Sequence, residues 1–357
     1  MMVALSHSLL VLTVDGIDNI WFATFSDLAG VQSWIIRSLL IFLNGGAAVI
    51  VFFVLSGYVL GLSLDRHSLG IQRTIRFYAK RVFRLYPAHI VVLLAIVASM
   101  LLFHEYRVFE AGSAWYGLWY QSGINGPGIF KNLALMHIDL NHIAWSLQVE
   151  LAGSLFLPFA YLVARKVGLW LNIVVLAALV LLSWRSSNLF LIFLYCFYAG
   201  LILPQVHQQF KMALGGTSGN ALLLIGILTL CFGFTLAGPQ SLFGRVLIET
   251  IGSMIIIAYL INSSNAQSWF NRFLARDVIN RLGRYSYSFY LLHFIILYWI
   301  AYALFHVVSA ELLAAVPLLF GMGMALVSVP LTFFLSGKMY HFVEVPMVKM
   351  GKRLLGK

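Results

Sequence analysis

The sequence WSLQVELAGSLFLPFAYLVA, residues 145–164, places the carboxylate of Glu150 inside an otherwise apolar run. A helix of about 20 predominantly apolar residues is long enough to cross a bilayer. An ionised carboxylate near the middle of a membrane costs roughly 2.5–3.5 kcal/mol or more, so one that is kept there indicates a functional site. The stretch therefore predicts a membrane-embedded catalyst or transporter, and it argues against a passive anchor.

The composition extends this interpretation to the whole chain. Hydrophobic residues make up 61% of the 357 residues and charged residues only 10%, whereas soluble domains contain about 25% charged residues. Long apolar runs favour spanning helices, because a transmembrane barrel would show short alternating segments instead. We predict an all-α polytopic membrane protein with about ten transmembrane helices and a single domain over residues 1–357, without an extra soluble domain. The candidate spans are residues 2–14, 46–64, 86–103, 143–164, 168–184, 189–203, 220–237, 245–262, 286–306 and 312–336. The first of these is too short to cross, so we expect the native chain to extend upstream.

The distribution of charge predicts the orientation. A formal net charge of +11 could indicate a nucleic-acid partner. The basic residues instead collect in alternate loops, above all in 66–84 and 263–284, and in the C-terminal tail. The positive-inside rule then places both termini in the cytoplasm. We therefore expect contacts with membrane lipids and no nucleic-acid partner.

The segment KRVFRLYP (80–87) lies where a basic loop enters a span. Arg81 and Arg84 are three residues apart, so on a helix they share one face. Guanidinium groups bind phosphate bidentately, and together with Arg76 they would form a cytoplasmic site for a polyphosphorylated donor. The alternative is that these arginines only anchor the loop on the cytoplasmic side.

The segment FFVLSGY (52–58) carries a hydroxyl and a glycine inside a span. Ser56 and Gly57 fit small-residue helix packing, or close approach of the backbone to a ligand that threads the bundle. Trp145 suits the membrane interface, and Ser146 and Glu150 follow it inward. Glu150 is expected to have a functional role or to join a polar network with an arginine or histidine.

Histidines are distributed over several segments. His293 lies in YSYSFYLLH (285–293) on a predicted span, where a packing role and a functional role both remain open. His137, Asp139 and His142 have no spacing that fits a specific metal site, and we interpret them as loop residues.

Taken together, these segments resemble the acyltransferase-3 family. FFVLSGY after a Gly-Gly turn, KRVFRLYP, WSLQVE, YSYSFYLLH and FVEVP (342–346) follow one another in the family's order, over about residues 3–353. Members of the family are integral-membrane acyltransferases that O-acylate surface polysaccharides, peptidoglycan, lipooligosaccharides and some secreted small molecules. The resemblance therefore implies an acyltransferase in a bacterial inner membrane.

The resemblance also implies roles for individual residues. MVALSHS is similar to the family's first span, which makes His7 the catalytic residue. The family's Arg-x-x-Arg pair, associated with acyl-CoA, corresponds to Arg81 and Arg84. Two further motifs correspond to Trp145, Ser146, Glu150, Ser286, Tyr287, Ser288, Tyr290, Leu291 and His293. One family feature has no counterpart here, an arginine about ten residues before the first histidine.

The function expected from these residues is transfer of an acyl group, most simply acetyl, from cytoplasmic acetyl-CoA to a hydroxyl of a cell-surface or exported carbohydrate. His7 would act as general base, and Glu150 would orient it or another cation. Ser56 and Gly57 would lie along the pantetheine arm of acetyl-CoA, and no metal is needed. The expected substrate-binding residues are Trp145, Ser146, Ser288 and His293. Expected partners are a carbohydrate or glycolipid acceptor and membrane lipids, with a homo-oligomer left open.

A proton-coupled secondary transporter is the competing class. Glu150 and Glu249 within spans would suit proton coupling. Transporters often contain paired, interrupted helices in corresponding halves, and no such pairing is evident in this sequence.

Overall fold

The computed structural model describes residues 1–65, 70–121, 124–211, 214–237 and 241–355. Within these ranges the chain is predominantly helical, and its β-structure consists of isolated bridges without strands. Eight helical stretches in the described residues are long and apolar enough to cross a membrane. These stretches are Val31–Asp65, Ile71–Phe103, His142–Lys166, Leu189–Phe210, Gly216–Thr235, Leu242–Ile261, Asp277–Val307 and Pro317–Leu355. The prediction of an all-α polytopic membrane protein is confirmed. The single domain over residues 1–357 stays a prediction.

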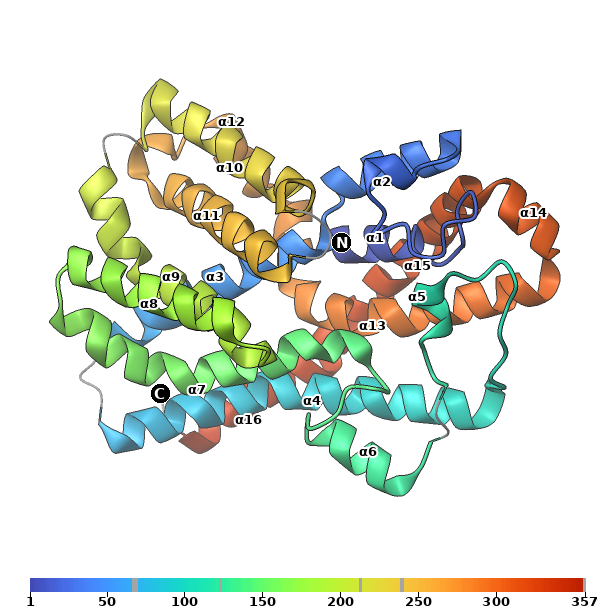
Figure 1. The fold of residues 1–357 in the computed structure, drawn as a ribbon. Helices are drawn as coiled ribbons and strands as arrows, with labels where there is room; N and C mark the ends of the chain where they lie inside the picture. The colour runs from blue at the N-terminus through green and yellow to red at the C-terminus, as the bar shows by residue number, and fades with distance from the viewer. Residues whose placement is uncertain (66–69, 122–123, 212–213, 238–240, 356–357) are drawn as a thin grey trace. The chain divides into compact units, whose positions relative to one another are not determined.

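Contacts group the residues into two compact units. The first unit contains Met1–Gly45, Ala79–Trp145 and Arg281–Lys357, and the second contains Gly46–Tyr78 and Ser146–Asn280. The first is built from α1 (Met2–Ser8), η1 (Phe25–Asp27), α2 (Val31–Phe42), most of α4 (Ile71–Phe103), α5 (Ala114–Gly117), α6 (Gly126–Leu133), η2 (His142–Ala144), most of α13 (Asp277–Val307), α14 (Ala310–Ala315), α15 (Pro317–Met339), η4 (Tyr340–Glu344) and α16 (Val345–Leu355) (Figure 1). The second is built from α3 (Gly45–Asp65), α7 (Trp145–Lys166), α8 (Leu169–Arg185), α9 (Leu189–Phe210), α10 (Gly216–Ala237), α11 (Leu242–Ile261), η3 (Ser263–Asn265) and α12 (Trp269–Leu274).

The predicted span over residues 2–14 is wrong at its C-terminal end. The helix α1 ends at Ser8, and at 1.5 Å per residue its seven residues rise only about 10 Å. The apolar residues that follow are buried by pairing with another segment: the Thr13 amide donates to the Ala111 carbonyl at 3.0 Å, and the Ser113 amide donates to the Val11 carbonyl at 2.9 Å. An apolar run can thus be buried within protein without crossing the membrane.

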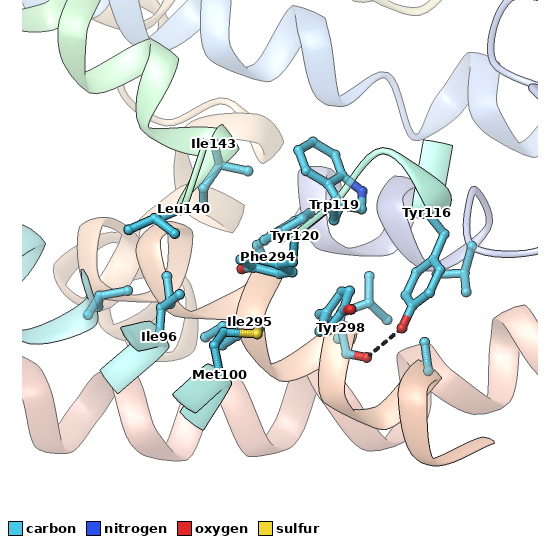
Figure 2. Close-up of a cluster of buried hydrophobic side chains, with 14 of the residues drawn as sticks. Ile96, Met100, Tyr116, Trp119, Tyr120, Leu140, Ile143, Phe294, Ile295 and Tyr298 are labelled. Atoms are coloured by element: carbon cyan, nitrogen blue, oxygen red, sulfur yellow. Dashed lines mark hydrogen bonds between the residues drawn. The ribbon is translucent and has the colours of Figure 1, made fainter. Parts of the chain in front are cut away.

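A cluster of buried hydrophobic side chains, several of them aromatic, lies in the core of the first unit (Figure 2). The rings of Tyr116 and Tyr298 stack with centroids 5.0 Å apart and planes 11° apart. The Tyr116 hydroxyl donates to the Tyr298 carbonyl at 3.4 Å. Stacked aromatic pairs add about 0.5–1.5 kcal/mol beyond their buried area. The segment between α4 and α7 is therefore fixed on α13 by packing.

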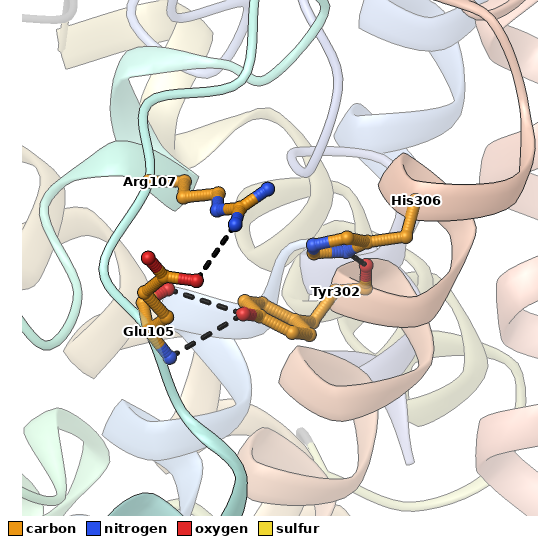
Figure 3. A network of polar contacts seen from close by, with 4 residues as sticks. All are labelled: Glu105, Arg107, Tyr302 and His306. Atoms are coloured by element: carbon orange, nitrogen blue, oxygen red, sulfur yellow. Dashed lines mark hydrogen bonds and ion pairs between the residues drawn. The ribbon is translucent and has the colours of Figure 1, made fainter.

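Polar contacts attach the start of that segment to the last turns of α13 (Figure 3). The Tyr302 hydroxyl donates to the Glu105 carbonyl at 3.1 Å, and the His306 imidazole donates to the Tyr302 carbonyl at 2.8 Å. Arg107 forms an ion pair with the Glu105 carboxylate at 2.7 Å. Both partners of this pair are more than half exposed, so it contributes about 0–1 kcal/mol. Aromatic packing and the bond from the Tyr302 hydroxyl to the Glu105 carbonyl attach the segment to α13. The Glu105–Arg107 pair lies within the segment, and the His306–Tyr302 bond lies within α13.

Glycines permit close helix packing in the second unit. A Cβ atom on Gly57 would collide with the carbonyl oxygen of Phe197, and one on Gly200 would collide with that of Val54. The helices α3 and α9 therefore cross at backbone contact. This packing explains Gly57 without any ligand, whereas the predicted contact of Ser56 and Gly57 with the pantetheine arm stays a prediction.

Candidate active site

Two histidines meet in the first unit. His7 lies on α1 and His293 on α13, and Nδ1 of His7 is 3.1 Å from Nε2 of His293. Their ring centroids are 5.2 Å apart, with planes inclined by 30°. His293 is only 1% exposed, and His7 is half-buried. The structure thus brings together the predicted catalytic histidine and a residue that the sequence had placed in substrate binding.

The hydrogen bonds determine which nitrogen carries each proton. Nδ1 of His293 lies 2.6 Å from the carbonyl oxygen of Tyr290. A carbonyl only accepts, so this nitrogen carries a proton, and the Nε2 of a neutral His293 is therefore an acceptor. Nδ1 of His7 must then donate to it, which leaves the lone pair of a neutral His7 on Nε2. The Tyr290 carbonyl and His293 thus hold His7 in the tautomer whose Nε2 can accept a proton.

Close backbone contact holds α1 in place. The helix packs against α15, where a Cβ atom on Gly321 would stand 3.2 Å from the Ser8 carbonyl oxygen. On another side, a Cβ atom on Gly45 would stand 2.7 Å from the Ser6 hydroxyl. Larger side chains at either glycine would push α1 away, so these two positions fix the distance between His7 and His293.

Aromatic rings surround the histidine pair. The Trp115 ring lies 5.0 Å from the His7 ring, and the Phe294 ring lies 6.4 Å from it. Trp115 in turn contacts Trp119, with centroids 5.4 Å apart. Trp115 and Trp119 were not expected at the site, because no local motif links them to His7. These rings contribute an apolar surrounding to the base.

A second polar cluster lies on the same helix, α13. The Ser288 hydroxyl donates to a carboxylate oxygen of Glu344; Ser288 is fully buried and Glu344 is 8% exposed. Glu344 is the last residue of η4, a short π-helical segment, and such segments are frequent at functional sites. Arg84 is close enough to interact electrostatically with Glu344. This cluster places one arginine of the Arg-x-x-Arg pair beside Ser288.

The arginine segment is fixed to its neighbours by packing and hydrogen bonding. The Tyr287 hydroxyl donates to the Leu85 carbonyl at 2.6 Å. A Cβ atom on Gly351 would lie 2.9 Å from the Phe83 side chain, so α16 packs closely on α4. These contacts involve Phe83 and Leu85, so they fix the backbone of α4 on both sides of the exposed Arg84. In the sequence Glu344 stands out only as part of FVEVP (342–346), and its contact with Ser288 depends on the tertiary fold.

The remaining predicted residues occupy different surroundings. Arg81 is buried at 7% exposure, whereas Arg76 and Arg84 are exposed. Arg66, in the same basic loop, lies outside the described residues. Trp145 begins α7 and is half-buried, and Ser146 is buried behind it.

Glu150 is 4% exposed and belongs to the second unit. Its backbone carbonyl accepts a hydrogen bond from the Ser154 hydroxyl at 2.8 Å. The expected role of Glu150 toward His7 stays a prediction. Within the first unit, His293 is a side chain that contacts His7 through a hydrogen bond.

Comparisons with known proteins identify the class of the chain. Residues 1–337 match the acyltransferase domain that defines the acyltransferase-3 family. The acyltransferase MdmB of Streptomyces mycarofaciens is 26% identical over 285 residues, which cover 71% of this chain and 68% of MdmB. No solved structure matches the chain. The match covers most of the sequence, and the chain belongs to the acyltransferase-3 family of membrane acyltransferases.

Proposed function

We propose that this acyltransferase moves an acyl group, most simply acetyl, from cytoplasmic acyl-CoA to a hydroxyl of a cell-surface or exported carbohydrate. The bacterial inner membrane is the location in which both substrates would be within reach. The hydrogen bond from Nδ1 of His7 to Nε2 of His293 carries the proposal. It leaves the outer nitrogen of His7 as a base inside an aromatic enclosure.

In the proposed reaction, the acceptor hydroxyl loses its proton to Nε2 of His7. The hydroxyl oxygen bonds to the thioester carbonyl carbon, the carbon–sulfur bond breaks, and the proton passes from His7 to the leaving thiolate. A positioned base of this kind contributes roughly 10²–10⁴-fold. His293 accepts from the imidazolium that forms transiently, and the Tyr290 carbonyl keeps the His293 ring in the required tautomer.

The donor would enter from the arginine end of α13. Ser288 and His293 are five residues apart, or about 7.5 Å along a helix. Arg84, beside the Ser288–Glu344 pair, suits the phosphates of acyl-CoA, because guanidinium groups bind phosphate with two hydrogen bonds. Buried Arg81 would support the same end of the site. The thioester would then lie toward His293 and His7.

Purified protein in detergent tests the proposal with labelled acetyl-CoA. We expect release of CoA and transfer of label to carbohydrate in a membrane extract, and we expect His7→Ala to lower the rate of both by about 10²–10⁴-fold while acetyl-CoA still binds. Intact acetyl-CoA after incubation with folded protein would contradict the proposal. Proton-coupled flux in proteoliposomes without such turnover would favour the transporter.

A further inference from the structure

A polar hollow of about 140 Å³ lies in the first unit, between α6 and the segments on either side of it. Its lining includes Tyr120, Gln121, Asn125, Asp139 and His142. The lining is mixed in polarity, because leucine and isoleucine side chains alternate with these groups. On the predicted topology this segment, 104–142, faces the exterior. None of the residues expected at the site from the sequence lines this hollow.

Two residues that line the hollow, Tyr120 and His142, carry buried polar atoms without partners among the described residues, and so do their neighbours in sequence, Trp119 and Asn141. In the described part of the chain, no hydrogen-bond partner is found for the Trp119 indole nitrogen, the Tyr120 hydroxyl, Nδ1 of His142 or the side-chain amide of Asn141. Trp119 and Tyr120 are each 8% exposed, and Asn141 is 1% exposed. Buried polar groups are nearly always hydrogen-bonded. Tyr120 and His142 therefore bring polar groups without described partners to the lining of the hollow, where a polar ligand could pair with them.

The conformation and ionisation of Tyr120 suit a ligand-binding role. Its backbone φ is 57°, which is a strained value for a bulky residue. Strain of this kind is found preferentially at ligand and active sites. Burial raises the pKa of the Tyr120 hydroxyl, so it stays protonated and can both donate and accept. A ligand hydroxyl is a suitable partner for such a group.

Aromatic rings connect the hollow with the histidine pair. The His142 and Trp119 rings meet edge to face with centroids 4.1 Å apart. Trp119 contacts Trp115 at 5.4 Å, and Trp115 contacts His7 at 5.0 Å. A ligand ring bound in the hollow next to His142 would therefore be separated from His7 by the side chains of Trp119 and Trp115. The Trp119 ring also contacts the Phe294 ring, with centroids 4.6 Å apart, and Figure 2 draws both side chains.

We propose that this hollow binds a sugar ring of the acyl acceptor. Sugars combine hydroxyl groups with apolar C–H faces, which matches a lining of amide, carboxylate, phenol and imidazole groups beside an indole. A purely apolar acceptor would leave the buried donors and acceptors unpaired, at a cost of about a lost hydrogen bond each. The proposal rests on the acyl-transfer function proposed above, since it identifies where the acceptor of that reaction binds.

Sugar binding is tested directly on the full-length protein, in a detergent without a sugar headgroup. The probes are the methyl glycosides of glucose, galactose, mannose and rhamnose, and saturation-transfer NMR reports their affinities. Tyr120→Phe removes one hydroxyl, and we expect it to weaken the tightest probe by about three- to tenfold. Gln121→Trp changes an exposed residue and fills the hollow, so we expect it to abolish binding.

Tyr106→Phe is the matched control, because Tyr106 is 42% exposed in the same segment and does not line the hollow. Binding of no glycoside by the wild type, or equal binding by wild type, Tyr120→Phe and Gln121→Trp, would overturn the inference. Acetyl-CoA turnover by the wild type is measured in parallel. Glycoside binding that both variants weaken, without any acetyl-CoA turnover, would reject the acyl-transfer function and leave the sugar site standing.

Discussion

Nδ1 of His7 donates to Nε2 of His293 over 3.1 Å, although 286 residues separate them in sequence. The Tyr290 carbonyl fixes the far nitrogen of His293 at 2.6 Å. The chain of carbonyl, imidazole and imidazole resembles the way a third group orients the base in catalytic triads. Here a backbone carbonyl takes the orienting position. The arrangement gives His7 and His293 different expected roles, and mutations can separate them.

Removing the base and removing its partner should have different consequences. We expect His7→Ala to lower kcat by about 10²–10⁴-fold, the contribution of a positioned base. His293→Leu removes only the acceptor for Nδ1 of His7, so a smaller loss of about ten- to 100-fold is expected. His293→Gln keeps a carbonyl oxygen as acceptor and should recover part of that loss. His137→Ala is the control, because His137 is exposed by about half. Equal activity of His293→Leu and wild type would mean that His293 only packs.

The pH dependence of turnover should reflect the protonation of the His7 imidazole and its hydrogen bond to His293. Only neutral His7 can accept the hydroxyl proton, so kcat/KM should fall on the acid side as that ring becomes protonated. His293 accepts from Nδ1 of His7 and thereby stabilises the charged ring. His293→Leu should therefore move the acid limb to lower pH, and His293→Gln should move it less. A profile recorded from pH 4 to pH 9 in which the limb stays fixed in both variants would show that the hydrogen bond does not affect the base.

Substitutions of the two arginines in the KRVFRLYP segment should have different effects on the KM for acetyl-CoA and on the melting temperature. Arg84 is exposed next to the Ser288–Glu344 pair, so Arg84→Ala should raise the KM for acetyl-CoA without changing the melting temperature. The loss of one charge-assisted bond to phosphate is worth about 1.5–3 kcal/mol, or roughly ten- to 150-fold. Arg84→Lys should recover only part of it, because an ammonium group cannot bind bidentately.

Arg81 is 7% exposed. Arg81→Ala should therefore also lower the melting temperature, since it empties a buried position. Exposed Lys80, one residue away, provides Lys80→Ala as the control for a general loss of positive charge. An unchanged KM for acetyl-CoA in both arginine variants would return the pair to a role as topological anchors.

Gly57 distinguishes helix packing from a ligand channel. Gly57→Ala places a methyl group against the Phe197 carbonyl, and overpacking of this kind typically costs about 1–3 kcal/mol. We expect a lower melting temperature with an unchanged KM for acetyl-CoA in the protein that remains folded. Gly283→Ala is the matched control, because nothing lies within 4 Å of a Cβ at this exposed helical position. There an alanine should be neutral or slightly stabilising. A raised KM in Gly57→Ala would support contact with the donor instead.

The sequence predicted those features that depend on local pattern. Apolar runs of sufficient length became helices, and the segment YSYSFYLLH, predicted to lie on a span, carries Ser288, Tyr290 and His293 on one helix. The extent of α1 could not be predicted from local pattern. The mostly apolar residues 9–14 are buried by pairing with residues 111–113, which lie about 100 residues later in the sequence. The same holds for Trp115 beside His7 and for Glu344 beside Ser288. Each is a contact between segments that only the tertiary fold brings together.

The orientation of the chain can be tested with single cysteines. Basic residues in 263–284 predict a cytoplasmic loop, and the segment 104–142 is predicted to be external. Arg272→Cys and Glu110→Cys introduce thiols at exposed positions in these two segments, in a background in which Cys196 and Cys231 are replaced by alanine. An impermeant thiol reagent added to intact cells should label Glu110→Cys and should label Arg272→Cys only after permeabilisation. Labelling of Arg272→Cys in intact cells would show that the orientation of the chain is the reverse of the predicted one. It would then place Arg84 outside, away from cytoplasmic acetyl-CoA, and would contradict the proposed direction of transfer.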